Sequence, residues 1–351
     1  MKEFFPDYKN IVDACYNIEP KRFPLYDHII SPKIIEAILN KKFAELYNGD
    51  SADLKEYFRI LCDFFKKMEY DAVIYECCAG EAMPGSGCLG NHKEGVIKDR
   101  DDFNKYPWHE LKSLYFDKYF KNFEAITSVM PEGMKLVGGV GNGVFECVQD
   151  IVGYTDLCYI KVDDPELYAD LFVKVGDMLI EIWTEVLKHF AHHFAVCRFG
   201  DDLGFKSDTL IAHDDIKNLV LPQYKRIIDV IHANNKPFLL HSCGSIFGVM
   251  EDIIGVGINA KHSNEDVIAP FSVWAEKYGR KIGNFGGIDT DIICSDDSSM
   301  VKKYTTGVLD SVIGKGYKGL AFGTGNSVPD YASVAGYLAM NEAIREYRNK
   351  I

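Results

Sequence analysis

The feature that most constrains this chain is a repeated alternation of short apolar runs and longer helical patterns. Each run is rich in β-branched residues and is followed by glycine or polar residues. Such alternation predicts parallel strands joined by right-handed crossovers. Eight units favour an α/β fold, a closed (β/α)8 TIM barrel with extra N-terminal helices, over an open doubly wound sheet. The expected strands are Arg22–Tyr26, Ala72–Glu76, Lys135–Val140, Phe194–Phe199, Pro237–Leu240, Gly257–Lys261, Lys281–Phe285 and Gly319–Phe322.

Helices are expected between these strands. A Ser-Pro pair predicts a helix over Pro32–Lys42, and an Asp-Pro pair starts a long amphipathic helix from Pro165 to about His189. Further helices are expected over 52–69, 214–234, 267–278, 298–313 and 330–348, and Pro222 should kink or divide the second of these. We find no linker-like tract, so the sequence predicts one barrel domain over residues 1–351, with residues 1–70 including an N-terminal helical elaboration.

The charge of the chain argues against two classes of partner. With 39 Lys and Arg against 52 Asp and Glu, the formal net charge is −13. Such a surface repels phosphate backbones and anionic membranes, so neither nucleic acid nor a membrane is an expected partner. The N-terminal stretch is charged and has no apolar signal region. The ten cysteines are scattered, which favours reduced thiols and a cytoplasmic location.

Residues capable of chemistry follow the expected strands. In TIM barrels the active site lies at the carboxyl ends of the strands, so these residues should converge there. We expect catalytic roles for Glu76, Asp201 and Asp202. The residues expected to bind substrate are His28, Asn142, His262, Asp289 and Asn326.

The motif with the most specific chemistry is His241-Ser-Cys243. Residues i and i+2 of an extended segment point the same way, so the imidazole and the thiol should converge. Zinc binds both groups, and a catalytic zinc keeps three protein ligands and one open position. The pair therefore predicts a zinc site, with Glu76 as a further candidate ligand or base. The alternative is a purely structural pair at a strand end.

The adjacent carboxylates of Asp201 and Asp202 are expected to hydrogen-bond or protonate substrate, because mutual repulsion raises the pKa of one of them. The alternative for Asp202 is a helix cap or a loop acid. The glycine-rich stretch 138–143 lacks the spacing of a dinucleotide-binding loop. Its glycines are expected to allow a tight turn or close backbone approach.

Taken together, these motifs resemble the uroporphyrinogen decarboxylase superfamily over nearly the whole chain. The resemblance rests on 21–25, 200–204, Pro222, 241–244, 286–289 and the Gly323-x-Gly325 pair. Decarboxylases of this superfamily have an arginine-rich segment after the first strand, whereas residues 26–31 here contain no arginine. A substrate with many carboxylates requires cations, so the resemblance favours the methyltransferase branch.

That branch serves corrinoid proteins and binds zinc through an H-x-C pair and a later cysteine, according to the resemblance. His241 and Cys243 match the pair, but Thr324 stands at the third position, and threonine is a poor zinc ligand. Either Glu76, Asp201 or His262 completes the site, or zinc binds weakly or not at all.

The resemblance therefore implies transfer of a methyl group between a small molecule and a cognate corrinoid protein, assisted by zinc or an acid. The departure at Thr324 favours a demethylase that acts on a methoxylated aromatic or another methyl donor without a thiol. Two alternatives stay open. One is a decarboxylase or lyase acting on a smaller acid, and the other is a non-catalytic tetrapyrrole- or corrinoid-binding protein. The sequence leaves a homodimer open as well.

Overall fold

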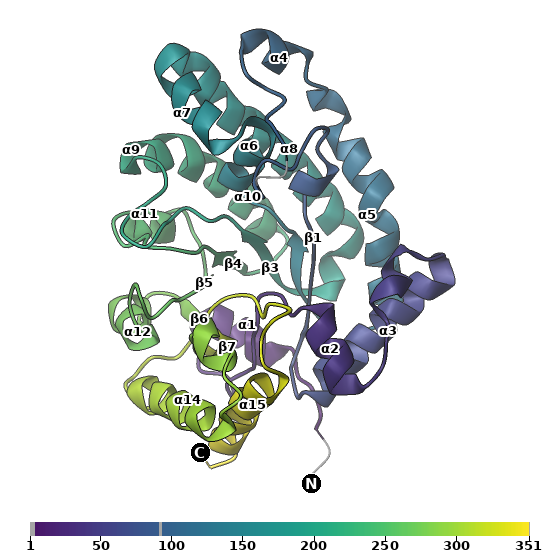
Figure 1. Ribbon diagram of the computed structural model, residues 1–351, viewed down its shortest axis with the longest axis vertical. Helices are drawn as coiled ribbons and strands as arrows, with labels where there is room; N and C mark the ends of the chain where they lie inside the picture. Colours follow the sequence, from purple (N-terminus) through teal and green to yellow (C-terminus); the bar gives the residue numbers. More distant parts are fainter. Residues whose placement is uncertain (1–3, 91–92, 351) are drawn as a thin grey trace.

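A computed structural model describes residues 4–90 and 93–350 of the chain. Within this part, seven strands form one parallel sheet in the order β1 to β7, and each strand pairs with the next. The sheet curls into a partial barrel with helices on its outer side (Figure 1). The predicted TIM-barrel-like α/β fold is therefore confirmed. The strands are β1 (Val73–Cys77), β2 (Leu136–Val140), β3 (Phe194–Gly200), β4 (Phe238–His241), β5 (Ala260–His262), β6 (Gly283–Ile288) and β7 (Leu320–Thr324).

The first predicted strand, Arg22–Tyr26, is wrong as a regular strand. Leu25 forms a single parallel bridge with Phe322 of β7. Tyr26 N–H donates to the Phe322 carbonyl over 2.9 Å, and Phe322 N–H donates to the Pro24 carbonyl over 3.0 Å. Proline has no N–H for a ladder, and among the described residues no bridge joins this segment to β1. The barrel therefore has a seam between the N-terminal segment and β1.

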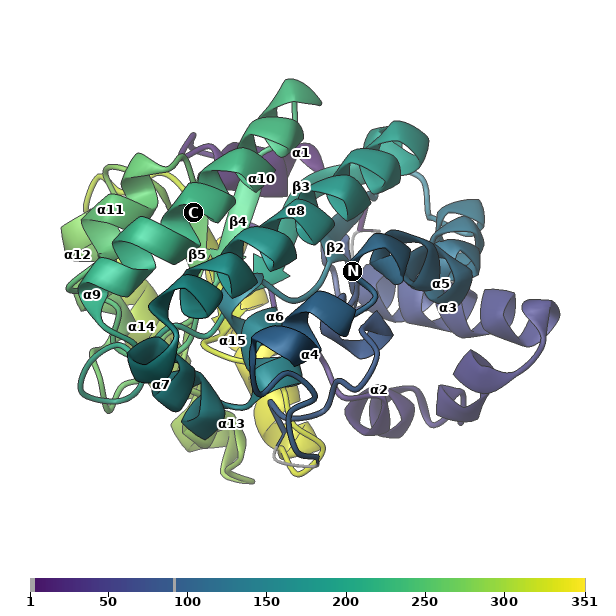
Figure 2. The ribbon, with the colours of Figure 1, turned by 90° about the horizontal axis from the view of Figure 1, so that it is seen from above.

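Helices surround the sheet on its outer side (Figures 1 and 2). The α-helices are α1 (Lys9–Cys15), α2 (Pro32–Leu39), α3 (Ser51–Lys67), α4 (Arg100–Lys105), α5 (Leu111–Ser128), α6 (Val144–Val152), α7 (Tyr154–Asp163), α8 (Pro165–Phe190), α9 (His213–Asp215), α10 (Leu221–Ala233), α11 (Met250–Gly255), α12 (Phe271–Tyr278), α13 (Thr290–Ile293), α14 (Ser298–Val312) and α15 (Val334–Arg348). Among the described residues, no helix is both long enough and apolar enough to cross a lipid bilayer.

The N-terminal helices cover the seam. Ser31 caps α2 by accepting the Lys33 N–H, as the Ser-Pro pair predicts. A capping box formed by Asp50 and Asp53 starts α3, which buries Leu61 and Phe65 among other apolar side chains. The 3-10 helix η1 (Ala44–Asn48) lies between the two helices. Figure 1 shows α2 and α3 beside β1. Helices and their side chains therefore occupy the place where a closed barrel would have a paired strand.

The helical region 214–234 is irregular ahead of Pro222, as the sequence predicts. A π-helix, η5 (Ile216–Val220), follows α9 and leads directly into α10, where Pro222 stands in the first turn. Proline is tolerated there because the first helical N–H groups have no intrahelical acceptor. The resulting α10 places Tyr224 against the carboxyl end of β3, where its hydroxyl donates to Asp201.

Candidate active site and metal centre

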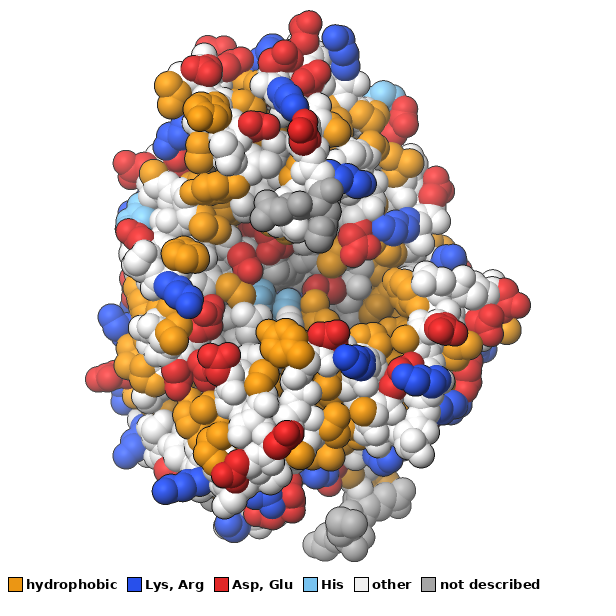
Figure 3. Space-filling view, in the orientation of Figure 1, with side chains coloured by type: hydrophobic (Ala, Val, Ile, Leu, Met, Phe, Trp, Pro, Cys, Tyr) orange, Lys and Arg blue, Asp and Glu red, His pale blue; other side chains and the backbone are white. Residues whose placement is uncertain are grey.

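The carboxyl ends of the strands meet at one face of the molecule, and that face is hollowed. Figure 3 shows histidine and acidic side chains within the hollow and hydrophobic side chains along part of its wall. Most of the residues that the sequence predicts for the site come from segments at or just beyond these strand ends. The hollow therefore lies where a TIM barrel normally carries out its chemistry.

His241 and Cys243 converge as their spacing predicts. His241 ends β4, and its Nε2 atom lies 3.3 Å from the Cys243 sulfur. The Asn326 amide donates to the same sulfur over 3.2 Å, and the Ser263 hydroxyl lies 3.7 Å from it. Burial raises the pKa of the Cys243 thiol. A cation at this sulfur would favour the thiolate, and the Asn326 amide is placed to stabilise that anion.

Asp202 adds a third donor atom to this pair. Its Oδ1 lies 3.7 Å from His241 Nε2 and accepts the Cys243 N–H over 2.8 Å. The three donor atoms of Asp202, His241 and Cys243 all lie within 4.8 Å of one another. Zinc bonds of roughly 2.0–2.3 Å in tetrahedral geometry place two ligand atoms about 3.3–3.6 Å apart. The cluster therefore has a spacing that fits zinc, and Asp202 lies at the third position, for which the sequence suggested Glu76, Asp201 or His262.

The close approach of two loops brings Asp202 into this position. Gly204, after β3, lies against Gly244, after β4, and the Gly204 N–H donates to the Cys243 carbonyl over 3.2 Å. Gly244 has φ +81, and a Cβ at this position would lie 2.1 Å from the Gly204 backbone. Only glycine permits this conformation and this contact. The last glycine of each motif, Gly204 and Gly244, thus holds the carboxylate beside the thiol.

Hydrogen bonds fix the tautomers of the two histidines. His262 Nε2 lies 2.9 Å from the Thr324 carbonyl oxygen, which can only accept, so this nitrogen carries a proton. In a neutral ring the Nδ1 of His262 is then an acceptor. It lies 2.7 Å from His241 Nδ1, which must donate. The remaining nitrogen of His241, Nε2, keeps its lone pair and faces Cys243 and Asp202, as a metal ligand must.

Burial keeps both rings neutral. Burial, together with the neighbouring cations, lowers the pKa of His262 to about 3 and the pKa of His241 well below its ordinary value. His28 stacks on His241 with ring centroids 3.6 Å apart and nearly parallel planes. His28, His241 and His262 also form a second group of possible ligands. We favour the mixed cluster because the Arg198 guanidinium contacts His28 Nδ1 and would repel a metal ion.

Glu76 and His28 both bind a buried arginine. The fully buried Arg198 of β3 contacts the Glu76 carboxylate and His28 Nδ1 closely, and it donates to the His28 carbonyl over 2.8 Å and to the Tyr26 hydroxyl over 3.1 Å. Glu76 is thus an ion-pair partner, which separates it from the cluster of Asp202, His241 and Cys243. A buried guanidinium requires such partners, because an unpaired buried charge is very costly.

Asp201 lies beneath helix α6 and is fully buried. Its two oxygens accept the N–H groups of Phe145 and Glu146 over 2.9 and 2.7 Å, and the Tyr224 hydroxyl over 2.6 Å. Burial raises the pKa of Asp201 to about 6, although these three donors oppose the shift. The structure places this predicted catalytic acid at a helix N-terminus, while the side chain of Asp202 is 41% exposed.

Glu146 is a further acid beside Asp202. Its Oε1 accepts the Asp202 N–H over 3.2 Å, and its Oε2 accepts the Asn142 amide over 2.9 Å. Burial, followed by the charges of Asp202 and Asp201, raises the pKa of Glu146 well above its ordinary value. The surroundings of Glu146, near the proposed metal ligands, therefore favour its protonated form. Asn142 also accepts the Gly80 N–H over 3.1 Å, so both ends of its amide are engaged within the protein.

The other predicted residues divide between the site and the scaffold. Asn326 contacts the Cys243 sulfur, as described above. Asp289 caps α13 by accepting the Asp291 N–H over 2.8 Å and also accepts the Asp266 N–H over 2.7 Å. Thr324 is fully buried, and its hydroxyl lies 2.7 Å from Asp27 Oδ1. The Thr324 hydroxyl is thus bound to Asp27, and the Thr324 backbone carbonyl accepts a hydrogen bond from His262.

Two of these groups, Arg198 and Glu146, were not predicted as parts of the site. An arginine inside the apolar run 194–199 was the available signal, since a charge in a buried strand needs a partner. Glu146 lies on α6, a helix that the sequence pattern did not predict. Asp202 was predicted as a catalytic acid and not as a metal ligand.

The chain matches one known family and is similar to several solved structures. A family model described as Uroporphyrinogen decarboxylase (URO-D) matches residues 59–347. Among solved structures, a methyltransferase from Methanosarcina mazei superposes with a TM-score of 0.70 at 13% identity, covering 98% of this chain and 99% of the other. A sugar phosphate isomerase/epimerase from Parabacteroides distasonis gives a TM-score of 0.40 at 15% identity, covering 93% and 99%. Comparison with curated protein sequences gives no match.

Proposed function

Since the chain belongs to the uroporphyrinogen decarboxylase family, we propose that it is a methyltransferase that moves a methyl group from a small methylated compound to a corrinoid-bearing partner protein. The observation that carries this proposal is the cluster of Asp202, His241 and Cys243 at the strand ends. The overall fold shared with a methyltransferase over almost the full length of both chains is compatible with it.

We propose two roles for the residues of the site: some would hold a metal ion, and one would supply a proton. Asp202, His241 and Cys243 would hold zinc, and a bound zinc would act as a Lewis acid toward the heteroatom that leaves the methyl group. His262 orients His241 through the 2.7 Å hydrogen bond. Asn326 stabilises the Cys243 sulfur. Glu146, whose pKa is raised by burial, is the proposed proton donor.

For a methyl ether, the bond between the methyl carbon and oxygen breaks and the oxygen keeps the electron pair. The reduced cobalt of the partner would be the nucleophile and would accept the methyl group. The released oxygen takes a proton from the enzyme, and we assign this transfer to Glu146. The hollow in the strand-end face gives the partner an approach to the cluster (Figure 3).

Electrostatics argues against a substrate with many carboxylates. The buried cations near the strand ends, Arg198 and Lys261, are both engaged by the protein. Arg198 pairs with Glu76. Lys261 contacts the Ser263 carbonyl and lies 3.7 Å from the Trp274 ring centroid. Neither is available to neutralise an incoming anion without breaking buried contacts.

The test measures metal content and methyl transfer together. Zinc per chain is determined by mass spectrometry for the wild type and for Asp202→Ala, His241→Ala and Cys243→Ala, with Cys158→Ala as the exposed-cysteine control. We expect about one zinc in the wild type and the control, and loss in the other three. Transfer from methoxylated aromatics and from methylamines to cob(I)alamin is followed by visible absorbance. No zinc-dependent methylation with any donor would overturn the proposal.

A second candidate follows from the raised pKa of Glu146, which suits a decarboxylase or lyase acting on a smaller acid. Here the bond between carbon and the carboxylate breaks, carbon dioxide leaves, and the carbon takes a proton from the donor, without a metal. Release of carbon dioxide by the zinc-free protein, lost in Glu146→Gln, would favour this candidate. Tight corrinoid binding without turnover would instead indicate the non-catalytic alternative.

A further inference from the structure

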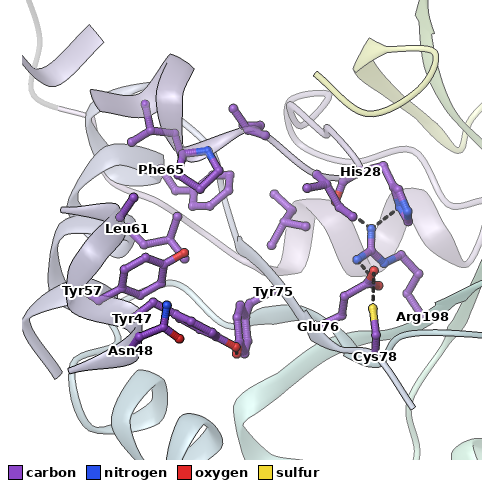
Figure 4. Close-up of a pocket in the computed structure, with 16 residues that line it drawn as sticks. His28, Tyr47, Asn48, Tyr57, Leu61, Phe65, Tyr75, Glu76, Cys78 and Arg198 are labelled. Carbon is purple, nitrogen blue, oxygen red and sulfur yellow. Dashed lines mark hydrogen bonds and ion pairs between the residues drawn. The ribbon is translucent and has the colours of Figure 1, made fainter. Parts of the chain in front are cut away.

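The seam of the barrel contains a cavity of about 330 Å³ between β1, the N-terminal segment and the helices α2 and α3. Figure 4 shows that this cavity has two chemically different ends. Tyr47, Tyr57, Leu61 and Phe65 lie at one, and Glu76, Cys78, Arg198 and His28 at the other. The same His28 ring stacks on His241. The polar end of the cavity is therefore next to the proposed metal ligands, and its apolar end lies under the N-terminal helices.

The apolar end has the size and chemistry of a pocket for one ring. Isoleucine, leucine and aromatic side chains line it, from Ile35 on α2 to Leu61 on α3 and Ile74 on β1. A buried cavity of about 150 Å³ with such a lining holds benzene. A volume about twice as large has room for a single ring with two or three small substituents. Small-molecule sites in proteins commonly combine such walls with a few polar groups.

The polar end favours an uncharged ligand. Glu76 and Arg198 form a closed ion pair there, and their side chains are 9% and 0% exposed. The two charges neutralise each other, so neither is free to pair with a charged ligand. A ligand anion would be repelled by Glu76, and a ligand cation would be repelled by Arg198. The aliphatic walls give neither ion a replacement for its water. A neutral oxygen substituent can still accept or donate hydrogen bonds at this end.

The hydroxyls of the tyrosines differ in their partners. Tyr47 and Tyr75 lie 3.2 Å apart and both accept from the Asn122 amide over 2.8 Å, so they hold each other. The Tyr57 hydroxyl has no hydrogen-bond partner in the described part of the chain, and Figure 4 shows it pointing toward the cavity. It is therefore available to a polar substituent on the far side of a bound ring.

We infer that the seam cavity binds an uncharged compound with one aromatic ring, with an ether oxygen at the polar end and any opposite hydroxyl at Tyr57. The role of this ligand rests on the proposed function, in which it is the methyl donor. The cavity places the ring of the donor in the wall of the barrel and leaves the strand-end hollow to the corrinoid-bearing partner.

The inference is tested by binding to the metal-free protein, without any corrinoid. Calorimetry or ligand-observed NMR compares methoxybenzene, 4-methoxyphenol, benzoate and benzylammonium. We expect the two neutral ethers to bind at least tenfold more tightly than the two ions. Leu61→Trp fills the cavity and should abolish binding. Tyr57→Phe should weaken 4-methoxyphenol by about 3- to 10-fold, the effect of one neutral hydrogen bond, and leave methoxybenzene unchanged. Tyr159→Phe, at an exposed tyrosine, is the control.

The binding results separate the assignment of the cavity from the proposed function. If neither ether binds up to its solubility, or if both bind equally to wild type, Leu61→Trp and Tyr57→Phe, the inference is overturned. Tyr57→Phe keeps the test valid should Leu61→Trp fail to fold. Ring binding without methyl transfer would leave the cavity assigned and overturn the proposed function. Transfer from an aromatic ether at the wild-type rate in Leu61→Trp would support the proposed function and overturn the assignment of the cavity.

Discussion

Replacing His262 by phenylalanine tests the orientation of the proposed metal ligand without touching that ligand. The substitution keeps a ring of similar size in a fully buried position. It removes the acceptor of the His241 Nδ1 proton and the donor to the Thr324 carbonyl. His241 is then free to carry its proton on Nε2, the nitrogen that faces Cys243 and Asp202. Loss of such supporting partners typically costs about 10- to 100-fold in metal affinity, or about 1.4–2.8 kcal/mol.

The assay is competition for zinc between the purified protein and a chromophoric chelator at fixed pH. His232→Phe is a matched control, because it removes another histidine hydrogen bond, to Asn259, outside the site. We expect His262→Phe to bind zinc 10- to 100-fold more weakly, His232→Phe to equal the wild type, and Cys243→Ala to lose zinc. Wild-type affinity in His262→Phe together with loss in Cys243→Ala would refute the tautomer argument. If Cys243→Ala and His262→Phe both bind zinc as tightly as the wild type, the proposed site is refuted.

Three further predictions concern stability. Glu76→Ala leaves Arg198 as an unpaired buried cation, so the free energy of unfolding should fall by about 3–5 kcal/mol in denaturant titrations. Burial lowers the pKa of Lys261 to about 7, so the unfolded state binds more protons between pH 7 and about 10. The free energy of unfolding should rise across this interval, and less so in Lys261→Met. The hydrogen bond from Lys42 lowers the pKa of Glu36 to about 2. Glu36→Gln should therefore cost about 1–2 kcal/mol at neutral pH, a difference that shrinks as the pH falls from about 4.5 toward 2.

The sequence predicts the repeating part of this fold well, because each strand and helix has a local cause. Six of the seven strands begin within two residues of the predicted start; β5 begins at Ala260, three residues later than predicted. The failure at residues 22–26 has a non-local cause. Whether a short apolar run pairs on both sides depends on what packs beside it, and here α2 and α3 occupy that side. The helices α5 and α6 were missed where the chain between two predicted strands was long.

In the candidate site, too, features with a local cause were predicted from the sequence, and features that depend on distant contacts were not. The convergence of His241 and Cys243 follows from the period of a strand, which is local and visible in the sequence. The position of Asp202 depends on contact between Gly204 and Gly244, in two different loops. The different environments of Asp201 and Asp202 depend on α6, whose N-terminal N–H groups face one of two adjacent carboxylates. No periodicity in the chain encodes which acid a distant helix will cover.

A single feature, the incomplete first strand, connects the scaffold to the proposed chemistry. Among the described residues Leu25 has one bridge, to Phe322, and two residues later the Asp27 side chain accepts the Thr324 N–H over 2.8 Å. That contact holds the end of β7, and the Thr324 carbonyl in turn fixes the proton on His262 and the lone pair of His241. The N-terminal segment thus serves both the orientation of the proposed ligand, through Asp27, and the wall of the seam cavity, through His28 and Ile30. Asp27→Asn should therefore weaken zinc binding in the chelator competition while leaving ring binding unchanged.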